Sequence, residues 1–164
     1  INGNILDESL EIMLYCFSEY GNSTDFSSQL EFVKLIDGPF KKWLDRYKYQ
    51  DRFPEYSIEY YRDKCTHILS QFENILKDNP FMSGDKLDFI DLATFPFIRQ
   101  FAHVNLEWFL ETFSTLSQWY ERIHNSSQFP TVMERYEIWE DGDSPLLINY
   151  YEIENIVPQI QQKL

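Results

Sequence analysis

The sequence predicts an all-helical fold, and three features lead to this prediction. Apolar residues recur at three- and four-residue steps along most of the chain, as they do on one face of a helix. Strand-like alternation of apolar and polar residues is nearly absent. Residues that begin and end helices separate the periodic segments. Because the chain has 164 residues, 43% of them hydrophobic, we expect one main packed core.

The helix boundaries follow from local signals. Gly21 lies where the first helix should end, since glycine is a common helix stop. Asp37 and Pro39 supply an N-cap carboxylate and a first-turn proline, so a new helix should begin there. Pro96 should bend or interrupt the central helix. The predicted helices cover residues 8–17, 27–36, 39–49, 57–77, 89–101, 114–123 and 128–136.

The strongest helix-start signal lies at Asp88. Its carboxylate can accept the backbone N–H of Asp91, and the Asp91 carboxylate can reach back to the N–H of Asp88. The helix that follows is apolar nearly all round, which is typical of a helix buried by its neighbours. We therefore interpret Asp91 as a structural capping residue rather than a catalytic acid.

Charge and composition exclude several functions. A formal charge of -13 would repel a nucleic acid backbone, so no nucleic acid partner is expected. The chain opens on Ile1 without a secretory leader, and it has no apolar run long enough to span a bilayer, so we expect a soluble cytoplasmic fragment and no membrane partner. Cys16 and Cys65 lie in apolar helical patterns and are interpreted as small buried hydrophobes. We predict no metal, because the histidines lack the spacing of ligands.

Several segments together resemble glutathione transferases. Residues 84–93 read GDKLDFIDLA and are similar to the loop and capping box that open the central helix of that superfamily. Residues 37–41 and 44–49 look like a motif of a bacterial subfamily, and residues 95–101 also fit. The resemblance extends over roughly residues 1–139 and implies a C-terminal helical domain, which in this superfamily follows a thioredoxin-like glutathione domain.

The resemblance also implies a division of the chain. Residues 1–20 would be a remnant strand and helix from the end of the thioredoxin-like domain, so that the chain begins inside a domain. Residues 21–139 would be the helical domain, and residues 140–164 an acidic linker and tail. The catalytic Cys, Ser or Tyr of the superfamily would lie upstream of Ile1. We therefore expect no catalytic residue in this chain and no activity from it alone.

Glu8 and Ser9 are the expected glutathione-binding residues, because residues 6–10 are similar to the superfamily's Glu/Gln-Ser pair at a helix start. Free N–H groups and the positive dipole end of a helix favour a carboxylate there, and Glu8 would hold the ammonium of the same glutamyl group. The alternative is an ordinary helix start with no ligand.

Residues 41–52 contain five of the fourteen basic residues of an otherwise acidic chain. Arg46 or Tyr47 is expected to contact the carboxylate of glutathione or an anionic co-substrate. The alternative is a solvated helix face that carries ordinary ion pairs with Asp45.

The function implied by the resemblance is that the full protein conjugates glutathione, as co-substrate, to a small apolar electrophile, or uses it to reduce one. This chain would supply the electrophile pocket, and the full protein would be a cytoplasmic homodimer that acts in detoxification. The alternative is a non-catalytic glutathione transferase-like module for protein interaction or stress response. The chain alone does not separate the two.

Overall fold

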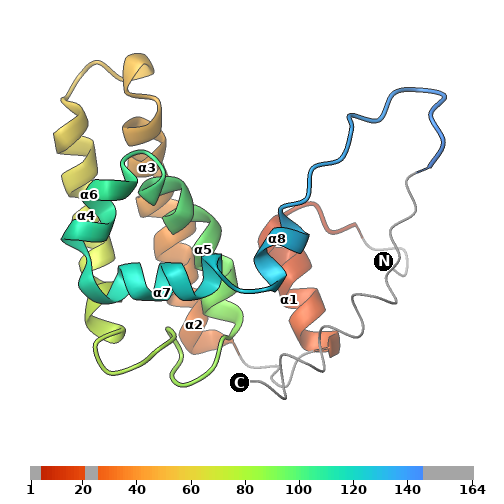
Figure 1. Cartoon of the computed structure of the whole chain (residues 1–164), viewed down its shortest axis with the longest axis horizontal. Helices are drawn as coiled ribbons and strands as arrows, with labels where there is room; N and C mark the ends of the chain where they lie inside the picture. Colours follow the sequence, from red (N-terminus) through yellow and green to blue (C-terminus); the bar gives the residue numbers. More distant parts are fainter. Residues whose placement is uncertain (1–4, 21–25, 146–164) are drawn as a thin grey trace. The chain divides into compact units, whose positions relative to one another are not determined.

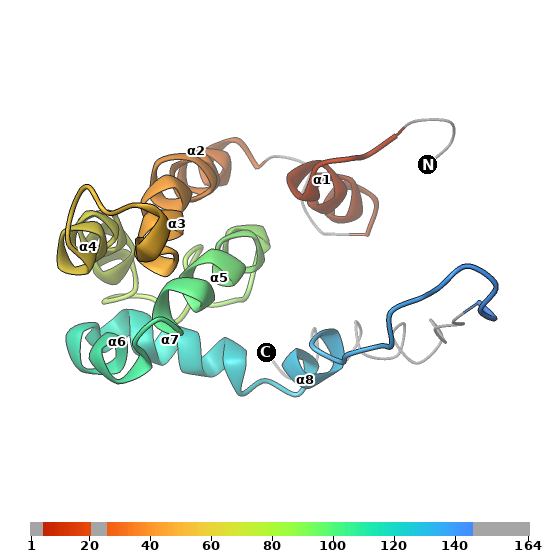
Figure 2. The same cartoon turned by 90° about the horizontal axis from the view of Figure 1, so that it is seen from above.

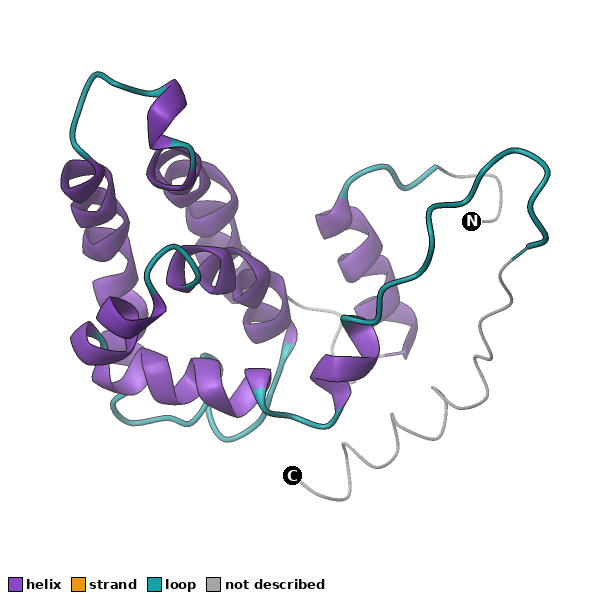
Figure 3. Ribbon diagram, turned by 45° about the horizontal axis from the view of Figure 1, so that its top comes forward, coloured by secondary structure: helices purple, strands orange, loops and turns teal. Residues whose placement is uncertain are grey.

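The computed structural model describes residues 5–20 and 26–145. Within these residues the fold is all-helical, as predicted, and no residue belongs to a β-strand (Figure 3). The expected remnant strand is not seen at residues 5–7, and residues 1–4 lie outside the described residues. Contacts within the chain divide it into two compact units, Ile1–Tyr120 and Glu121–Leu164.

Figure 1 shows the helices in their order along the chain. Most coincide with the predicted segments, although their ends differ by several residues. Their bounds are α1 Ser9–Tyr20, α2 Ser27–Leu35, η1 Ile36–Phe40, α3 Lys41–Lys48, η2 Gln50–Arg52, α4 Ile58–Ile75, α5 Phe89–Ala102, α6 Leu106–Thr112, α7 Ser114–His124 and α8 Gln128–Val132.

Helix α5 occupies the centre of the first unit. It packs against α1, α2, η1, α3 and α6, and Figure 2 shows it between α2 and α3 on one side and α6 on the other. Nine of its fourteen residues are buried, which agrees with the prediction of a central helix. The helix runs through Pro96 without interruption, so Pro96 does not divide it.

The predicted helix start at Pro39 is wrong. Instead, α2 continues through the π-helical segment η1 into α3, and Asp37 is not an N-cap. The backbone N–H of Lys41 donates to the carbonyl of Ile36, five residues earlier, which is the wider π-type bond. Because proline lacks an N–H and its ring crowds the preceding turn, a locally widened helix accommodates it.

Helix α6 was not predicted. Asn105 caps it by accepting the backbone N–H of Trp108 at 3.0 Å, and only Phe109 among its seven residues is buried. Two turns with one buried residue produce no clear helical period. The helix predicted over residues 128–136 is also shorter than expected, because α8 ends at Val132. The helical spacing noted at residues 152–163 lies outside the described residues.

The side chain of Glu73 on α4 caps the N-terminus of α7, which begins 41 positions later in the chain. Its Oε1 accepts the backbone N–H groups of Ser114 and Thr115 at 2.9 and 3.0 Å, and its Oε2 accepts that of Leu116 at 2.7 Å. Partial burial is the largest single influence on Glu73 and opposes its ionisation. The hydrogen bonds together outweigh it and lower the pKa below the ordinary value of 4.5. A carboxylate thus serves the orphan donors of a helix N-terminus.

Candidate functional site

The start of α1 holds the two residues expected to bind glutathione. Glu8 precedes the helix and its backbone carbonyl accepts the N–H of Ile12 at 3.1 Å, while Ser9 is the first helical residue. Both side chains are exposed. The first N–H groups of a helix have no partner within it, so this helix end has the donors that a carboxylate needs.

A hollow of about 350 Å³ lies between the end of α3, the end of α5 and the two residues that follow α5. We call it the α3–α5 hollow, and it is lined by Lys48, Arg99, Gln100, His103 and Val104. The Lys48 ammonium donates a hydrogen bond of 2.6 Å to Oε1 of Gln100, which joins the two helices. None of the five lining residues is acidic.

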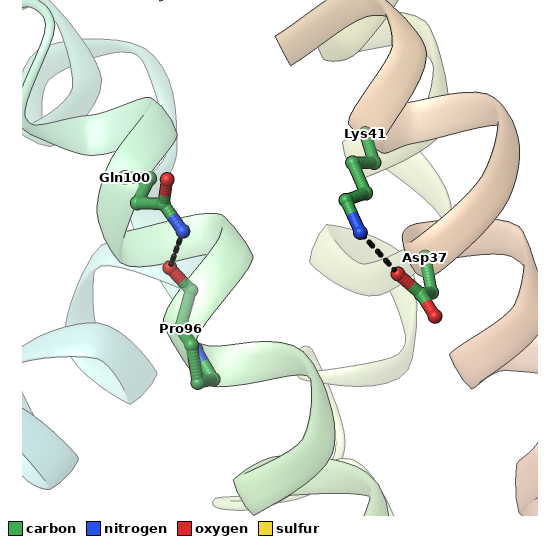
Figure 4. Close-up of polar contacts among 4 residues, drawn as sticks. All are labelled: Asp37, Lys41, Pro96 and Gln100. Carbon is green, nitrogen blue, oxygen red and sulfur yellow. Dashed lines mark hydrogen bonds and ion pairs between the residues drawn. The ribbon is translucent and has the colours of Figure 1, made fainter. Parts of the chain in front are cut away.

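Polar and apolar groups of η1, α3 and α5 also lie close to one another. Figure 4 shows Asp37 and Lys41 on the η1–α3 side, opposite Pro96 and Gln100 on α5. Lys41 forms an ion pair of 3.1 Å with Asp37, and its ammonium lies 5.6 Å from the centre of the Phe97 ring. Phe97, three residues before Gln100, lies on the same face of α5 and extends that face with an apolar ring.

His103 is held in position by the core. Its Nε2 lies 2.9 Å from the hydroxyl of Tyr120, and either group can be the donor, depending on the histidine tautomer. Tyr120 is 3% exposed, so its ring is fixed by packing. An imidazole is therefore anchored at the wall of the hollow. Sequence reasoning missed this, because the partners are 17 residues apart and on different helices.

A comparison with protein families gives a match over residues 39–131, and the description of the family is "Glutathione S-transferase, C-terminal domain". The chain belongs to this family. The matched segment of this glutathione S-transferase C-terminal domain includes every residue that lines the α3–α5 hollow and leaves Glu8 and Ser9 outside it. A comparison with curated proteins finds no match.

Within this glutathione S-transferase domain, Asp88 and Asp91 form the capping box of α5. Asp88 accepts the N–H of Phe89 at 2.7 Å, and Oδ2 of Asp91 accepts the N–H of Asp88 at 3.0 Å. Gln29 on α2 also bonds to this helix start: its side-chain amide donates to the Asp88 carboxylate and accepts the backbone N–H of Ile90. Burial raises the pKa of Asp91, although donors from Met82, Trp119 and Asp88 oppose that rise.

The structure places Tyr47 in the core of the transferase domain. Its side chain is 3% exposed, and its ring centre lies 5.2 Å from that of Phe101. Burial raises the pKa of Tyr47, and the charge of Arg62 opposes that rise. Tyr47 does not line the α3–α5 hollow, and its expected contact with an anion stays a prediction.

Arg46 is also engaged elsewhere. Its guanidinium lies 4.8 Å from the Phe53 ring centre and 5.7 Å from that of Trp43, and it donates to the carbonyl of Lys42 at 2.9 Å. Such cation–π contacts hold an arginine against aromatic faces. Arg46 does not line the hollow. The basic residue of this run that reaches the hollow is Lys48.

The two cysteines differ in their surroundings. Cys65 is completely buried and burial raises the pKa of its thiol, as expected for a small core residue. Cys16 is exposed, so the prediction that it is buried was wrong. In the described part of the chain, no group of three or more His, Cys, Asp or Glu residues could hold a metal ion, and no helix has the length and apolar character to cross a membrane.

Proposed function

We propose that this chain is the helical part of a protein that conjugates glutathione to a small electrophile, or uses glutathione to reduce one. The observation that carries the proposal is the family match, because residues 39–131 include the whole wall of the α3–α5 hollow. We assign this hollow to the electrophile. Its volume is in the range of small-molecule sites.

The chemistry needs a second domain, which in this proposal precedes residue 1 and stabilises the glutathione thiolate. The thiol proton passes to solvent, the thiolate sulfur forms a bond to the electrophilic carbon, and the leaving group departs with the bonding electron pair. In the reductive reaction the thiolate attacks a disulfide sulfur of the substrate and releases the other sulfur as a thiolate. The helices of this chain hold the electrophile beside the sulfur.

Glu8 and Ser9 have the role of an anchor in this proposal. The Glu8 carboxylate pairs with the ammonium of the glutamyl group, and the Ser9 hydroxyl with the first N–H groups of α1 binds the carboxylate of the same group. Their exposure and their position at the helix start support this role.

Calorimetric titration of glutathione into the complete protein tests the anchor. Replacement of both residues, Glu8→Ala with Ser9→Ala, removes charge-assisted hydrogen bonds and should weaken binding by about tenfold or more. Glu19→Ala, an exposed acid at the other end of α1, is the matched control and should bind like the unaltered protein. Equal affinities for all three proteins would refute the anchor.

We further propose that the complete protein is a cytoplasmic homodimer, as the family resemblance implies. Exposed residues on α1 support the proposal that another surface covers this helix in the complete protein. Ile12 is 45% exposed, and Cys16, one turn later, is exposed as well. Light scattering of the complete protein measures the mass directly, and a monomeric mass at micromolar concentration would contradict this proposal.

The second candidate function is a non-catalytic interaction module. An exposed aromatic and basic cluster favours it: Tyr56 is 54% exposed and stacks on Tyr60 at 4.3 Å, and the Lys64 ammonium lies 5.0 Å from the Tyr60 ring centre. Aromatic residues are enriched in binding interfaces. Conjugation of glutathione to a reactive aryl chloride by the complete protein decides between the two, because a module without catalysis leaves the reaction at its uncatalysed rate.

A further inference from the structure

The α3–α5 hollow has a local charge opposite to that of the chain. The formal charge of the protein is -13, yet the lining residues include the permanent cations Lys48 and Arg99, the titratable His103 and no acid. A concave wall of one sign attracts ligands of the other sign, and it does so more strongly where solvent is partly excluded. The positive wall is therefore suited to a negatively charged group of a ligand.

Lys48 and Lys41 show that the cations of α3 are not equivalent. Lys41 forms an ion pair with Asp37 at 3.1 Å. Lys48 instead donates to the neutral amide oxygen of Gln100 at 2.6 Å. An ammonium has three donors, so two remain for another acceptor, and its charge is not cancelled by a carboxylate in the described part of the chain.

The neighbouring groups hold Lys48 and its acceptor in place. The Gln100 amide nitrogen donates to the carbonyl of Pro96 at 3.2 Å (Figure 4), while the amide oxygen of Gln100 accepts from Lys48. His103 follows Arg99 by four positions, which places the two on one side of the C-terminal end of α5, and Nε2 of His103 lies 2.9 Å from the Tyr120 hydroxyl. Groups from the ends of α3 and α5 thus line the same small volume.

We propose that the electrophile bound in the α3–α5 hollow carries an oxyanion, such as a carboxylate, in addition to its reactive apolar part. This inference rests on the proposed function. The oxyanion accepts a hydrogen bond from the Lys48 ammonium, while Val104 contacts the apolar part. A purely apolar ligand would cover the Lys48 ammonium without providing an acceptor, which is costly, so the hollow selects against it.

Two aryl chlorides that differ only in charge provide the test. The complete protein is assayed with glutathione and either 4-chloro-3,5-dinitrobenzoate or its methyl ester, and each kcat/KM is divided by the uncatalysed rate constant. In both reactions the sulfur–carbon bond forms and chloride leaves with the electron pair. We expect the carboxylate to be preferred. Lys48→Gln should reduce the preference about tenfold, and Lys48→Arg should restore most of it.

Controls distinguish the effect of the Lys48 charge from that of any positive charge on the protein surface. Lys77→Gln removes an exposed lysine at the end of α4 and should leave the carboxylate-to-ester ratio unchanged. Higher ionic strength should reduce the ratio, since salt screens the attraction. A ratio equal in Lys48→Gln and Lys77→Gln, or a normalised preference for the ester in the unaltered protein, would overturn the inference.

A binding measurement distinguishes failure of the inference from failure of the proposed function. The unreactive 3,5-dinitrobenzoate and its methyl ester are titrated calorimetrically into the complete protein and into Lys48→Gln. Tighter binding of the carboxylate that is lost in Lys48→Gln supports the inference even if no conjugation occurs, in which case only the proposed function fails. Conjugation of both chlorides without any preference for the carboxylate would preserve the function and refute the anionic substrate.

Discussion

The indole N–H of Trp119 donates a hydrogen bond of 2.7 Å to Oδ1 of Asp91, and both side chains are completely buried. The same oxygen accepts the backbone N–H of Met82 at 2.8 Å. Together with the N–H of Asp88 on Oδ2, these donors join the start of α5, the loop before it and α7. A carboxylate that begins as a local cap therefore connects three segments of the core.

Removal of the Asp91 carboxylate should destabilise the fold more than the loss of an ordinary cap. Asp91→Ala leaves three buried or half-buried donors without their acceptor, so the free energy of unfolding should fall by about 3 kcal/mol or more, against about 1 kcal/mol for a simple cap. Urea unfolding measures this difference. Asp85→Ala, in the exposed part of the same loop, is the control and should change little; an unchanged Asp91→Ala midpoint would contradict the assignment.

Glu73 should contribute a pH-dependent stability. Because its pKa is lower in the folded protein than the ordinary 4.5, its ionisation stabilises the fold above that pH, and the contribution is lost as the pH falls through the folded-state pKa. Glu73→Gln should cost about 1 kcal/mol at pH 7, a modest value because solvent partly screens the site. Unfolding measured from pH 7 to pH 3 should show the two proteins converging; a constant difference would count against this role.

Gly84 should be needed for its backbone conformation. Its φ of 128° is one that other residues rarely adopt, and its N–H and carbonyl both bond to Phe81 in the turn that presents Met82 to Asp91. Gly84→Ala should lower the free energy of unfolding by about 1 kcal/mol or more, although space for the added methyl is available.

Gly38→Ala is the matched control for Gly84. Gly38 lies in the helical segment η1, again with open space around an added methyl. Alanine favours helix over glycine by about 1 kcal/mol, so this variant should be as stable as the unaltered protein or more stable. If both variants lose stability equally, the backbone argument for Gly84 fails.

The two thiols should react at different rates. Cys16 is exposed, whereas Cys65 is completely buried and its pKa is raised by burial, so a disulfide reagent at neutral pH should modify one thiol rapidly in the folded chain and two in urea. Cys16→Ser should remove the rapid reaction. Rapid modification of two thiols in the folded chain would show that the region around Cys65 opens readily.

Features that depend on neighbouring residues were predicted well from the sequence. The capping box at Asp88 and the apolar face of α4 are readable because their members are three or four residues apart. The helix-start signal at residues 37–39 was visible in the sequence, but it did not distinguish a new helix from a widened segment of a continuing one. Aspartate before a proline is typical of a helix start, yet here packing keeps one helical path and the backbone widens instead.

Features that depend on distant residues could not be predicted. Lys48 meets Gln100 across 52 positions, so the sequence indicated a basic run without showing which of its residues faces another helix. The sequence also did not show that Arg46 lies against the Phe53 ring or that Tyr47 is buried in the core, and their contact with a ligand stays a prediction. The α3–α5 hollow exists only because α3 and α5 pack together.

The carboxylate of Glu73 has a consequence for the order in which the chain folds. The donors that it serves on α7 follow it by 41 to 43 residues, and α7 receives this cap only when the intervening loop has closed. A short helix without a cap is marginal in water, so α7 should gain its full structure only after α4 has formed and docked. Completion of α7 is thus a late step of folding, and a peptide that covers α7 alone would lack its beginning.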